Sequence, residues 1–230
     1  MPDNLVLIKT DDGSHTLFVP VLNAHYHSSF GAIQESEFIF INTGLRFALS
    51  HLSAGLPVLN VLEIGFGTGL NALLTQIEAE RSGKKITYTA MEPYPLREEI
   101  WSQLNYPELL CSADYTSVFR KIHLSDWNRS EDVSSFFTLK KIQAGLETFF
   151  PEAEYFHLVY FDAFSQDVQP EMWTVEIFKR IFSGLHPGGI LVTYSVKGDV
   201  VRAMKAAGFV TEKLSGPPGK RHILRAMKQF

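Results

Sequence analysis

Three acidic residues stand at the ends of short apolar runs that predict β-strands: Glu63, Glu92 and Asp162. Between the first two lies a turn with glycine at every second position, Gly65–Gly69. Glycine is favoured where the backbone takes a positive φ or comes close to a ligand, and the free amides that start the following helix can face a polar group. Carboxylates and free amides at strand ends predict a site for a nucleotide-type cofactor.

The spacing of the turn distinguishes between cofactor classes. A dinucleotide fingerprint needs a glycine at position 70, which is Leu70, and a P-loop needs Gly-Lys-Ser/Thr, which is absent after Gly69. The pattern Glu63-x-Gly65-x-Gly67-x-Gly69 instead matches the first motif of S-adenosylmethionine-dependent methyltransferases. That cofactor has an amino-acid tail and a ribose, which backbone amides and a carboxylate can bind. A purely structural strand-to-helix turn is the alternative.

The other two carboxylates suit the same chemistry. Glu92 ends a strand at a position where doubly wound folds place a carboxylate that accepts hydrogen bonds from both ribose hydroxyls. Asp162 leaves an apolar strand at the edge where open α/β sheets bind ligands, so it is placed to orient an amine nucleophile toward the sulfonium methyl group. Phe164 is placed to stack on a planar substrate base. The alternatives are an exposed loop glutamate at position 92 and a capping aspartate at position 162.

The charge pattern limits the possible partners. A formal net charge of -4 provides no global attraction for nucleic acid, so an RNA partner would need a local basic patch. Lys197, Lys220 and Arg221 are the candidates for phosphate contacts. Solvated surface cations are the alternative for each.

Other motifs are weaker. His25 and His27 flank Tyr26, but no third ligand is identifiable and methyl transfer from a sulfonium needs no metal, so we expect none. Ser195 lacks the G-x-S-x-G elbow of a hydrolase. The single cysteine, Cys111, excludes an intramolecular disulfide and suits a reducing compartment. Because neither a signal peptide nor an apolar run of roughly 20 residues is present, we expect a cytoplasmic protein without a membrane partner.

The elements that must position these residues alternate between strand and helix, which predicts a mostly parallel sheet with helices on both faces. The predicted strands are 58–64, 86–91, 138–143, 156–161, 189–195, 209–214 and 222–227, the last two forming an antiparallel hairpin. The predicted helices are 37–54, 70–81, 95–104, 171–185 and 200–207. Runs at 5–10 and 16–19 predict a leading β-hairpin, residues 23–36 a functional loop, and residues 109–135 a mixture of loop and helix.

We therefore expect an α/β, doubly wound, Rossmann-like fold in two parts. Residues 1–57 form an extension of hairpin, loop and helix, and residues 58–230 form the cofactor-binding domain.

Several motifs taken together resemble the MnmC-like methyltransferases, and the resemblance covers nearly the whole chain. The motifs are Gly65–Asn71, Val159–Phe164, Gln169–Trp173 and Gly219–Arg221, with Gln34–Ser36 and Phe38–Ile41 in the leading segment.

The resemblance implies a class I methyltransferase whose substrate is the wobble uridine of certain tRNAs, carrying a 5-aminomethyl group and often a 2-thio group. The methyl group of S-adenosyl-L-methionine is transferred to the exocyclic amine, giving 5-methylaminomethyl-uridine. Bifunctional members also hold a flavin-dependent oxidase domain. We expect the stand-alone methyltransferase form, without FAD, with a separate enzyme supplying the aminomethyl-uridine.

The resemblance also assigns roles to residues. It places Asp162 at the catalytic position and makes Tyr26 and Glu35 contributors from the leading loop. One departure concerns the aspartate that contacts the adenine amino group in such enzymes: Gly145 takes its position, so adenine recognition is left to backbone groups or Gln143. The implied cofactor contacts are Glu63, Gly65, Gly67, Gly69, Asn71 and Glu92.

Two alternatives of other classes remain. One is an amine methyltransferase acting on a small molecule or a protein, which the net charge of -4 favours. The other is a non-catalytic cofactor- or RNA-binding module, which the departure at Gly145 leaves open.

Overall fold

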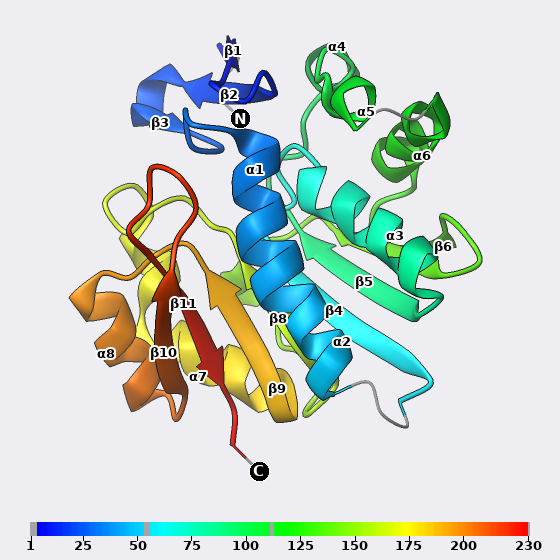
Figure 1. Cartoon of the computed structure of the whole chain (residues 1–230). Helices are drawn as coiled ribbons and strands as arrows, with labels where there is room; N and C mark the ends of the chain where they lie inside the picture. Colours follow the sequence, from blue (N-terminus) through cyan, green and yellow to red (C-terminus); the bar gives the residue numbers. More distant parts are fainter. Residues whose placement is uncertain (1–3, 53–55, 111–112, 230) are drawn as a thin grey trace.

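The computed structural model describes residues 4–52, 56–110 and 113–229. Within these residues the strands form an eight-stranded sheet, in the order β10-β11-β9-β8-β4-β5-β7-β6, and a separate three-stranded sheet (Figure 1). The strands of the large sheet are β4 (Val58–Ile64), β5 (Lys85–Met91), β6 (Ser130–Asp132), β7 (Phe137–Ile142), β8 (Phe156–Phe161), β9 (Leu185–Thr193), β10 (Val210–Ser215) and β11 (His222–Met227).

The order of the strands creates a site at one edge of the sheet. Strands β7, β5, β4, β8 and β9 run parallel, whereas β10 and β11 form the predicted antiparallel hairpin and β6 pairs antiparallel with β7. The chain proceeds from β4 to β5 on one side, and β8 lies on the other side of β4. Open α/β sheets bind ligands at the carboxyl ends of strands where the order reverses in this way.

Helices cover both faces of the sheet, as predicted. On β8, Leu158 and Tyr160 face the core under α3 and η2, whereas Val159 and Phe161 face the core under α7 and α8. Because both faces are buried, the central strands have nearly continuous apolar sequences. The helices are α1 (Ala32–Ser36), η2 (Glu37–Arg46), α2 (Phe47–His51), α3 (Leu70–Ser82), α4 (Glu98–Trp101), α5 (Tyr106–Leu109), α6 (Ala113–Leu124), α7 (Val175–Gly184) and α8 (Gly198–Ala206), with short 3-10 turns η1 (Pro20–Leu22), η3 (Leu146–Thr148) and η4 (Pro170–Trp173).

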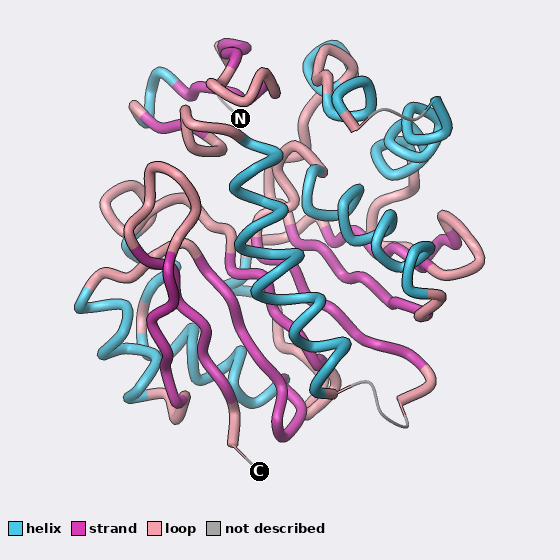
Figure 2. The backbone as a smooth tube through the Cα atoms, in the orientation of Figure 1, coloured by secondary structure: helices cyan, strands magenta, loops and turns pink. Residues whose placement is uncertain are grey.

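The leading segment forms the predicted hairpin, β1 (Val6–Lys9) with β2 (His15–Val19), and adds a short third strand, β3 (Ala24–His25), that the sequence analysis missed. In Figure 2 this small sheet lies beyond the end of a continuous helix formed by α1, η2 and α2. The helix crosses the sheet at Gly44, where an added Cβ would lie 2.9 Å from Val192.

This helix begins earlier than predicted, at Ala32 instead of residue 37. The reason is a cap supplied by the hairpin turn. The N–H of Ala32 donates to the Ser14 hydroxyl at 3.0 Å, and the N–H of Gln34 donates to the Asp12 carboxylate at 3.0 Å. Both donors belong to the first helical turn, whose N–H groups have no partner within the helix.

Other differences lie at element ends. The helix predicted over 95–104 is reduced to α4, and the helix predicted over 171–185 is divided at Thr174, whose side chain accepts from the N–H of Ile177 and caps α7. Strand β9 begins at Leu185 instead of residue 189, with a register irregularity opposite Phe156–Leu158. Residues 109–135, for which a mixture of loop and helix is predicted, contain α6 and β6.

Some expectations are not tested by these elements. Cys111 and the predicted helix end at 53–54 lie outside the described residues, and the division at residue 57 stays a prediction. Leu17 and Ile39 of the leading segment share one core cluster with the sheet.

No helix in the described part of the chain is long and apolar enough to cross a membrane.

The cap predicts that Asp12→Ala will destabilise the protein by about 1–3 kcal/mol, since the α1 amide and the turn lose their acceptor. Burial alone would raise the pKa of Asp12, but hydrogen bonds from Ser14, Gln34 and Thr10 lower it below the usual 3.8. The stabilisation is therefore present above pH about 4 and is lost as the pH falls through the lower folded pKa. Urea unfolding at several pH values measures both effects.

The matched control is Asp11→Ala, which removes the neighbouring exposed carboxylate. Equal stability of the two variants would contradict the capping role of Asp12.

Candidate active site

The turn after β4 is held between the ends of two neighbouring strands. The N–H groups of Gly65 and Phe66 both donate to the Met91 carbonyl at 3.0 Å, at the end of β5. On the other side, the N–H of Asp162 donates to the Ile64 carbonyl at 3.0 Å, at the end of β8. The turn and the Asp162 side chain are therefore positioned by the same backbone.

Two glycines are required by this arrangement. Gly65 has φ +93°, and an added Cβ would lie 2.7 Å from the backbone oxygen of Asp162. Gly67 has φ +49°, and an added Cβ would lie 3.0 Å from the ring of Tyr26. Positive φ is costly for residues with a Cβ; at Gly65 the Cβ would also clash with backbone, and at Gly67 the Tyr26 ring would have to shift. The leading segment thus lies directly against the glycine turn.

Glu92 braces the turn from the end of β5. Its carboxylate accepts hydrogen bonds from the N–H of Gly67 at 3.1 Å and of Tyr94 at 2.9 Å. Burial raises the pKa of Glu92 to about 7, against the lowering effect of these two hydrogen bonds. Each carboxylate oxygen can accept more than one hydrogen bond, so Glu92 retains capacity for a ligand hydroxyl.

Asp162 is fixed by Asn71, whose amide Nδ2 donates to its Oδ2 at 2.9 Å. Part of its surface faces the pocket, but surrounding protein desolvates the carboxyl group. This burial, and then the negative charge of Glu35, raise the pKa of Asp162 to about 8, while Asn71 and Lys220 oppose the shift. A carboxyl group with this pKa changes its protonation state near neutral pH, as general acid–base groups do.

Glu63 lies under the turn and does not line the cavity. It is fully buried, and its carboxyl oxygens have no hydrogen bond of ordinary geometry among the described residues, although the Asn71 and Tyr88 side chains lie close enough to lower its pKa. Asn71 Oδ1 also has no partner among them. Burial is the largest cause that raises the pKa of Glu63 well above its usual value, and the negative charge of Asp162 is the second. Buried acceptors without partners are uncommon and are typical of sites that complete their hydrogen bonds with a ligand or water.

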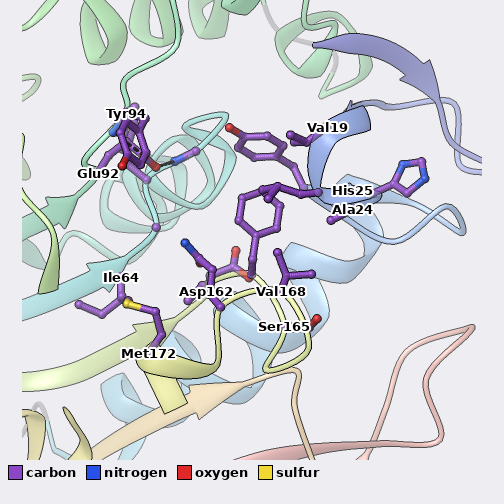
Figure 3. Close-up of a pocket in the computed structure, with 18 of the residues that line it drawn as sticks. Val19, Ala24, His25, Ile64, Glu92, Tyr94, Asp162, Ser165, Val168 and Met172 are labelled. Carbon is purple, nitrogen blue, oxygen red and sulfur yellow. Dashed lines mark hydrogen bonds between the residues drawn. The ribbon is translucent and has the colours of Figure 1, made fainter. Parts of the chain in front are cut away.

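The glycine turn, Glu92 and Asp162 line a cavity of about 950 Å³. Figure 3 shows Glu92 with Tyr94 on one side of it and Asp162 across from them, with Val19 and Ala24 contributed by the leading segment. The rings of Tyr26 and Phe164 meet edge to face at 5.2 Å between centroids. The volume is within the range of small-molecule and cofactor sites.

The structure brings most of the predicted site residues to this cavity. Those that line it are Tyr26, Glu35, Gly65, Gly67, Asn71, Glu92, Asp162, Phe164 and Lys220. Gly69, Lys197 and Arg221 do not line the cavity. Gly69 is in the turn, where an added Cβ would meet His123. Lys197 pairs with Asp167 at the surface, and Arg221 is exposed. The binding and catalytic roles of all these residues stay predictions.

The region after β7 contains a carboxylate that the sequence analysis missed. Gln143 is exposed and does not line the cavity, whereas Gly145 does. Glu147 also lines the cavity, and its Oε1 lies 2.1 Å from the position of an added Cβ at Gly145. The Glu147 carboxylate therefore occupies space that a side chain at position 145 would take. An acidic residue two positions after Gly145 was the available signal.

Within the described residues, no group of three or more His, Cys, Asp or Glu side chains is arranged to hold a metal ion. His27 is tied to Thr16, and the ring of His25 packs on Phe18 at 4.7 Å between centroids.

Comparison with known proteins identifies similar chains. A family model described as S-adenosyl-L-methionine-dependent methyltransferase matches residues 118–229. The tRNA 5-methylaminomethyl-2-thiouridine biosynthesis bifunctional protein MnmC of Aromatoleum aromaticum is 30% identical, over 94% of this chain and 34% of its own. The protein of the same name from Nitrosospira multiformis is 31% identical, over 87% of this chain and 33% of its own. The chain thus spans about a third of the length of these relatives.

A solved structure supports the fold. The crystal structure of MNMC2 from Aquifex aeolicus has a TM-score of 0.76 and 22% identity, covering 98% of this chain and 71% of that one. The predicted doubly wound fold with its N-terminal hairpin and C-terminal antiparallel strands is confirmed.

The close contact at Gly65 predicts that Gly65→Ala will be much less stable than Gly83→Ala. Gly83 also has a positive φ, +65°, but an added Cβ would have nothing within 4 Å. The backbone strain of about 1–2 kcal/mol applies to both variants, whereas the clash with Asp162 applies to Gly65→Ala alone. Urea unfolding followed by tryptophan fluorescence compares them. Equal loss of stability would mean that the β4 and β8 ends can separate without cost.

Proposed function

We propose that this chain, whose residues 118–229 match the S-adenosyl-L-methionine-dependent methyltransferase family model, methylates the exocyclic amine of 5-aminomethyl-uridine, or its 2-thio form, at the tRNA wobble position. The observation that carries the proposal is the position of Asp162, at the edge of the same cavity as the glycine turn and Glu92. The relatives named for 5-methylaminomethyl-2-thiouridine biosynthesis support the choice of acceptor.

The residues around the turn fit S-adenosyl-L-methionine. The first amides of α3, which begins at Leu70, have no partner within the helix and can meet its amino-acid tail, whereas the N–H groups of Gly65, Phe66 and Gly67 already donate to Met91 and Glu92. Glu92 offers a carboxylate for the ribose hydroxyls, and the buried Glu63 carboxyl group lies beneath the turn. Glu147 and the backbone at Gly145 are placed to meet a base. When bound, the cofactor supplies an electrophilic methyl group on a sulfonium.

Asp162 provides the group that an amine acceptor needs. An amine attacks through its lone pair and must therefore be neutral. Asn71 fixes one oxygen of the Asp162 carboxyl group, and the remaining acceptor capacity can orient an N–H of the amine and take up its proton. As the new N–C bond forms and the C–S bond breaks, the surplus proton on nitrogen passes to the Asp162 carboxylate or to water.

The surroundings of Asp162 suit a nucleobase. Phe164 and Tyr26 form an aromatic wall in the cavity, and unpaired bases of RNA commonly stack on such rings. Lys197 and Arg221 are exposed and are the candidates for phosphate contacts. We place the enzyme in the cytoplasm, with its aminomethyl substrate supplied by a separate enzyme, and the proposal includes no FAD and no metal.

A second candidate is an amine methyltransferase acting on a small molecule or protein, which the net charge of -4 favours. One assay separates the candidates: methyl-labelled S-adenosyl-L-methionine is incubated with the protein and tRNA lacking the final methyl group, followed by nucleoside analysis. We expect the label in 5-methylaminomethyl-uridine or its 2-thio form. Label in a polyamine or a protein, with none in tRNA, would support the second candidate. Failure to bind the cofactor in calorimetry would favour a non-catalytic module.

The role of Asp162 predicts that Asp162→Asn will lose about 100-fold or more of the single-turnover rate, in the range typical of a lost general base. Cofactor affinity should change little, because the turn and Glu92 remain. The matched control is Asp167→Asn, which removes an exposed carboxylate from the same loop. A rate for Asp162→Asn equal to that of the control would remove Asp162 from the mechanism.

A further inference from the structure

Lys220 lies inside the pocket, unlike the neighbouring basic residues. Its Nζ is 3.1 Å from Glu35 Oε1, and the side-chain exposures are 26% for Lys220 and 10% for Glu35. The same Nζ lies 5.0 Å from the centroid of the Tyr194 ring. Arg221 is exposed, and Lys197 pairs with an exposed aspartate. Lys220 therefore directs its charge into the cavity and away from a phosphate backbone.

Both partners of this ion pair are held by their surroundings. Lys220 is carried by the loop between β10 and β11, which in Figure 1 extends from the sheet toward the leading segment. An added Cβ at Gly219 would lie 2.1 Å from the ring of Phe30, so the loop rests against the segment that leads into α1. The other oxygen of Glu35 accepts from the N–H of Ser28 at 2.7 Å. The pair thus joins the two ends of the chain at the pocket.

The ion pair and Asp162 line the same cavity. Burial and then Glu35 raise the pKa of Asp162 to about 8, while Asn71 and Lys220 lower it. Asn71, from α3, carries no charge. Burial is the largest cause that raises the pKa of Glu63, from β4, and the charge of Asp162 is the second, so both effects favour its neutral form.

The phenols that face Asp162 are neutral as well. Burial is the largest cause that raises the pKa of Tyr88, from β5, and of Tyr194, which follows β9. Glu35 and Lys220 are therefore the charges that act on Asp162.

We propose that Lys220 is a positioning residue that acts through Glu35: its ammonium group neutralises the Glu35 carboxylate beside Asp162 and so raises the fraction of Asp162 in the ionised form that the amine requires. The inference rests on the proposed amine methylation. Two carboxylates in one partly desolvated pocket repel each other, and a cation on one of them relieves the repulsion. Without Lys220, the negative charge of Glu35 remains beside Asp162 and favours the protonated, inactive form.

The test is the pH dependence of single-turnover methyl transfer at saturating tRNA and cofactor. In the wild type, the rate should rise with pH through the ionisation of Asp162. Lys220→Met should move this rise upward by about one pH unit, and Glu35→Gln should move it downward, because the two changes remove opposite charges. Adding Glu35→Gln to Lys220→Met should reverse the upward shift. Lys220→Arg, which keeps the charge, should retain the wild-type profile.

The control is Arg221→Met, the adjacent exposed cation. It should raise KM for tRNA and reduce its salt dependence without moving the pH profile. If Lys220→Met behaves like Arg221→Met, with an unmoved pH profile, Lys220 is a phosphate contact and the inference is wrong.

A second readout does not depend on turnover. Carbon-13 NMR of the labelled Asp162 carboxyl group, assigned by its loss in Asp162→Asn, measures its ionisation directly in wild type and in Lys220→Met. An upward shift of the Asp162 titration in the variant supports the inference, even if no label reaches tRNA. The absence of label in tRNA would overturn the proposed function alone. An unchanged titration overturns the inference whatever the acceptor is.

Discussion

The site depends on the close approach of the backbone at the ends of β4 and β8. The N–H of Asp162 donates to the Ile64 carbonyl at 3.0 Å, and Gly65 provides the space by having no side chain toward the Asp162 carbonyl. A parallel sheet that reverses its strand order at β4 brings these two ends together. The glycine turn and the Asp162 carboxyl group are consequently set by one backbone contact, which in the proposed reaction also fixes the position of the cofactor relative to the acceptor.

Residues from the N-terminal and C-terminal regions of the chain form the rest of the site around the sheet edge. Tyr26 from the leading segment lies against Gly67, and Lys220 from the β10–β11 loop reaches Glu35 on α1. Helix α1 in turn starts where it does because Asp12 and the hairpin turn supply its N-terminal acceptors. Burial of Asp162 and the charges around it are therefore products of long-range packing. A cavity formed this way desolvates a carboxyl group, which shifts its protonation equilibrium toward neutral pH.

The sequence predicted the central strands well, because their apolar runs are bounded by turn residues. The bounds of β4, β8 and β11 match the predictions, and the glycine turn and Asp162 lie at one cavity as expected. Local pattern could not predict the start of α1, since its cap comes from residues about 20 positions earlier, nor the position of β6, a three-residue edge strand. Two further features were not predicted: the Glu147 side chain occupies the space beside Gly145, two residues earlier, and long-range packing brings Lys220 to Glu35.

In the proposed reaction, Asp162 faces the reacting amine across the methyl group of a cofactor bound at the glycine turn. A crystal structure with S-adenosyl-L-homocysteine and an anticodon stem–loop bearing 5-aminomethyl-uridine tests this most directly. We expect the cofactor to lie along Gly65–Gly69 with its ribose at Glu92, and the aminomethyl nitrogen to be hydrogen-bonded to Asp162. A flipped uridine bound away from Asp162, or a cofactor that does not contact Glu92, would contradict it.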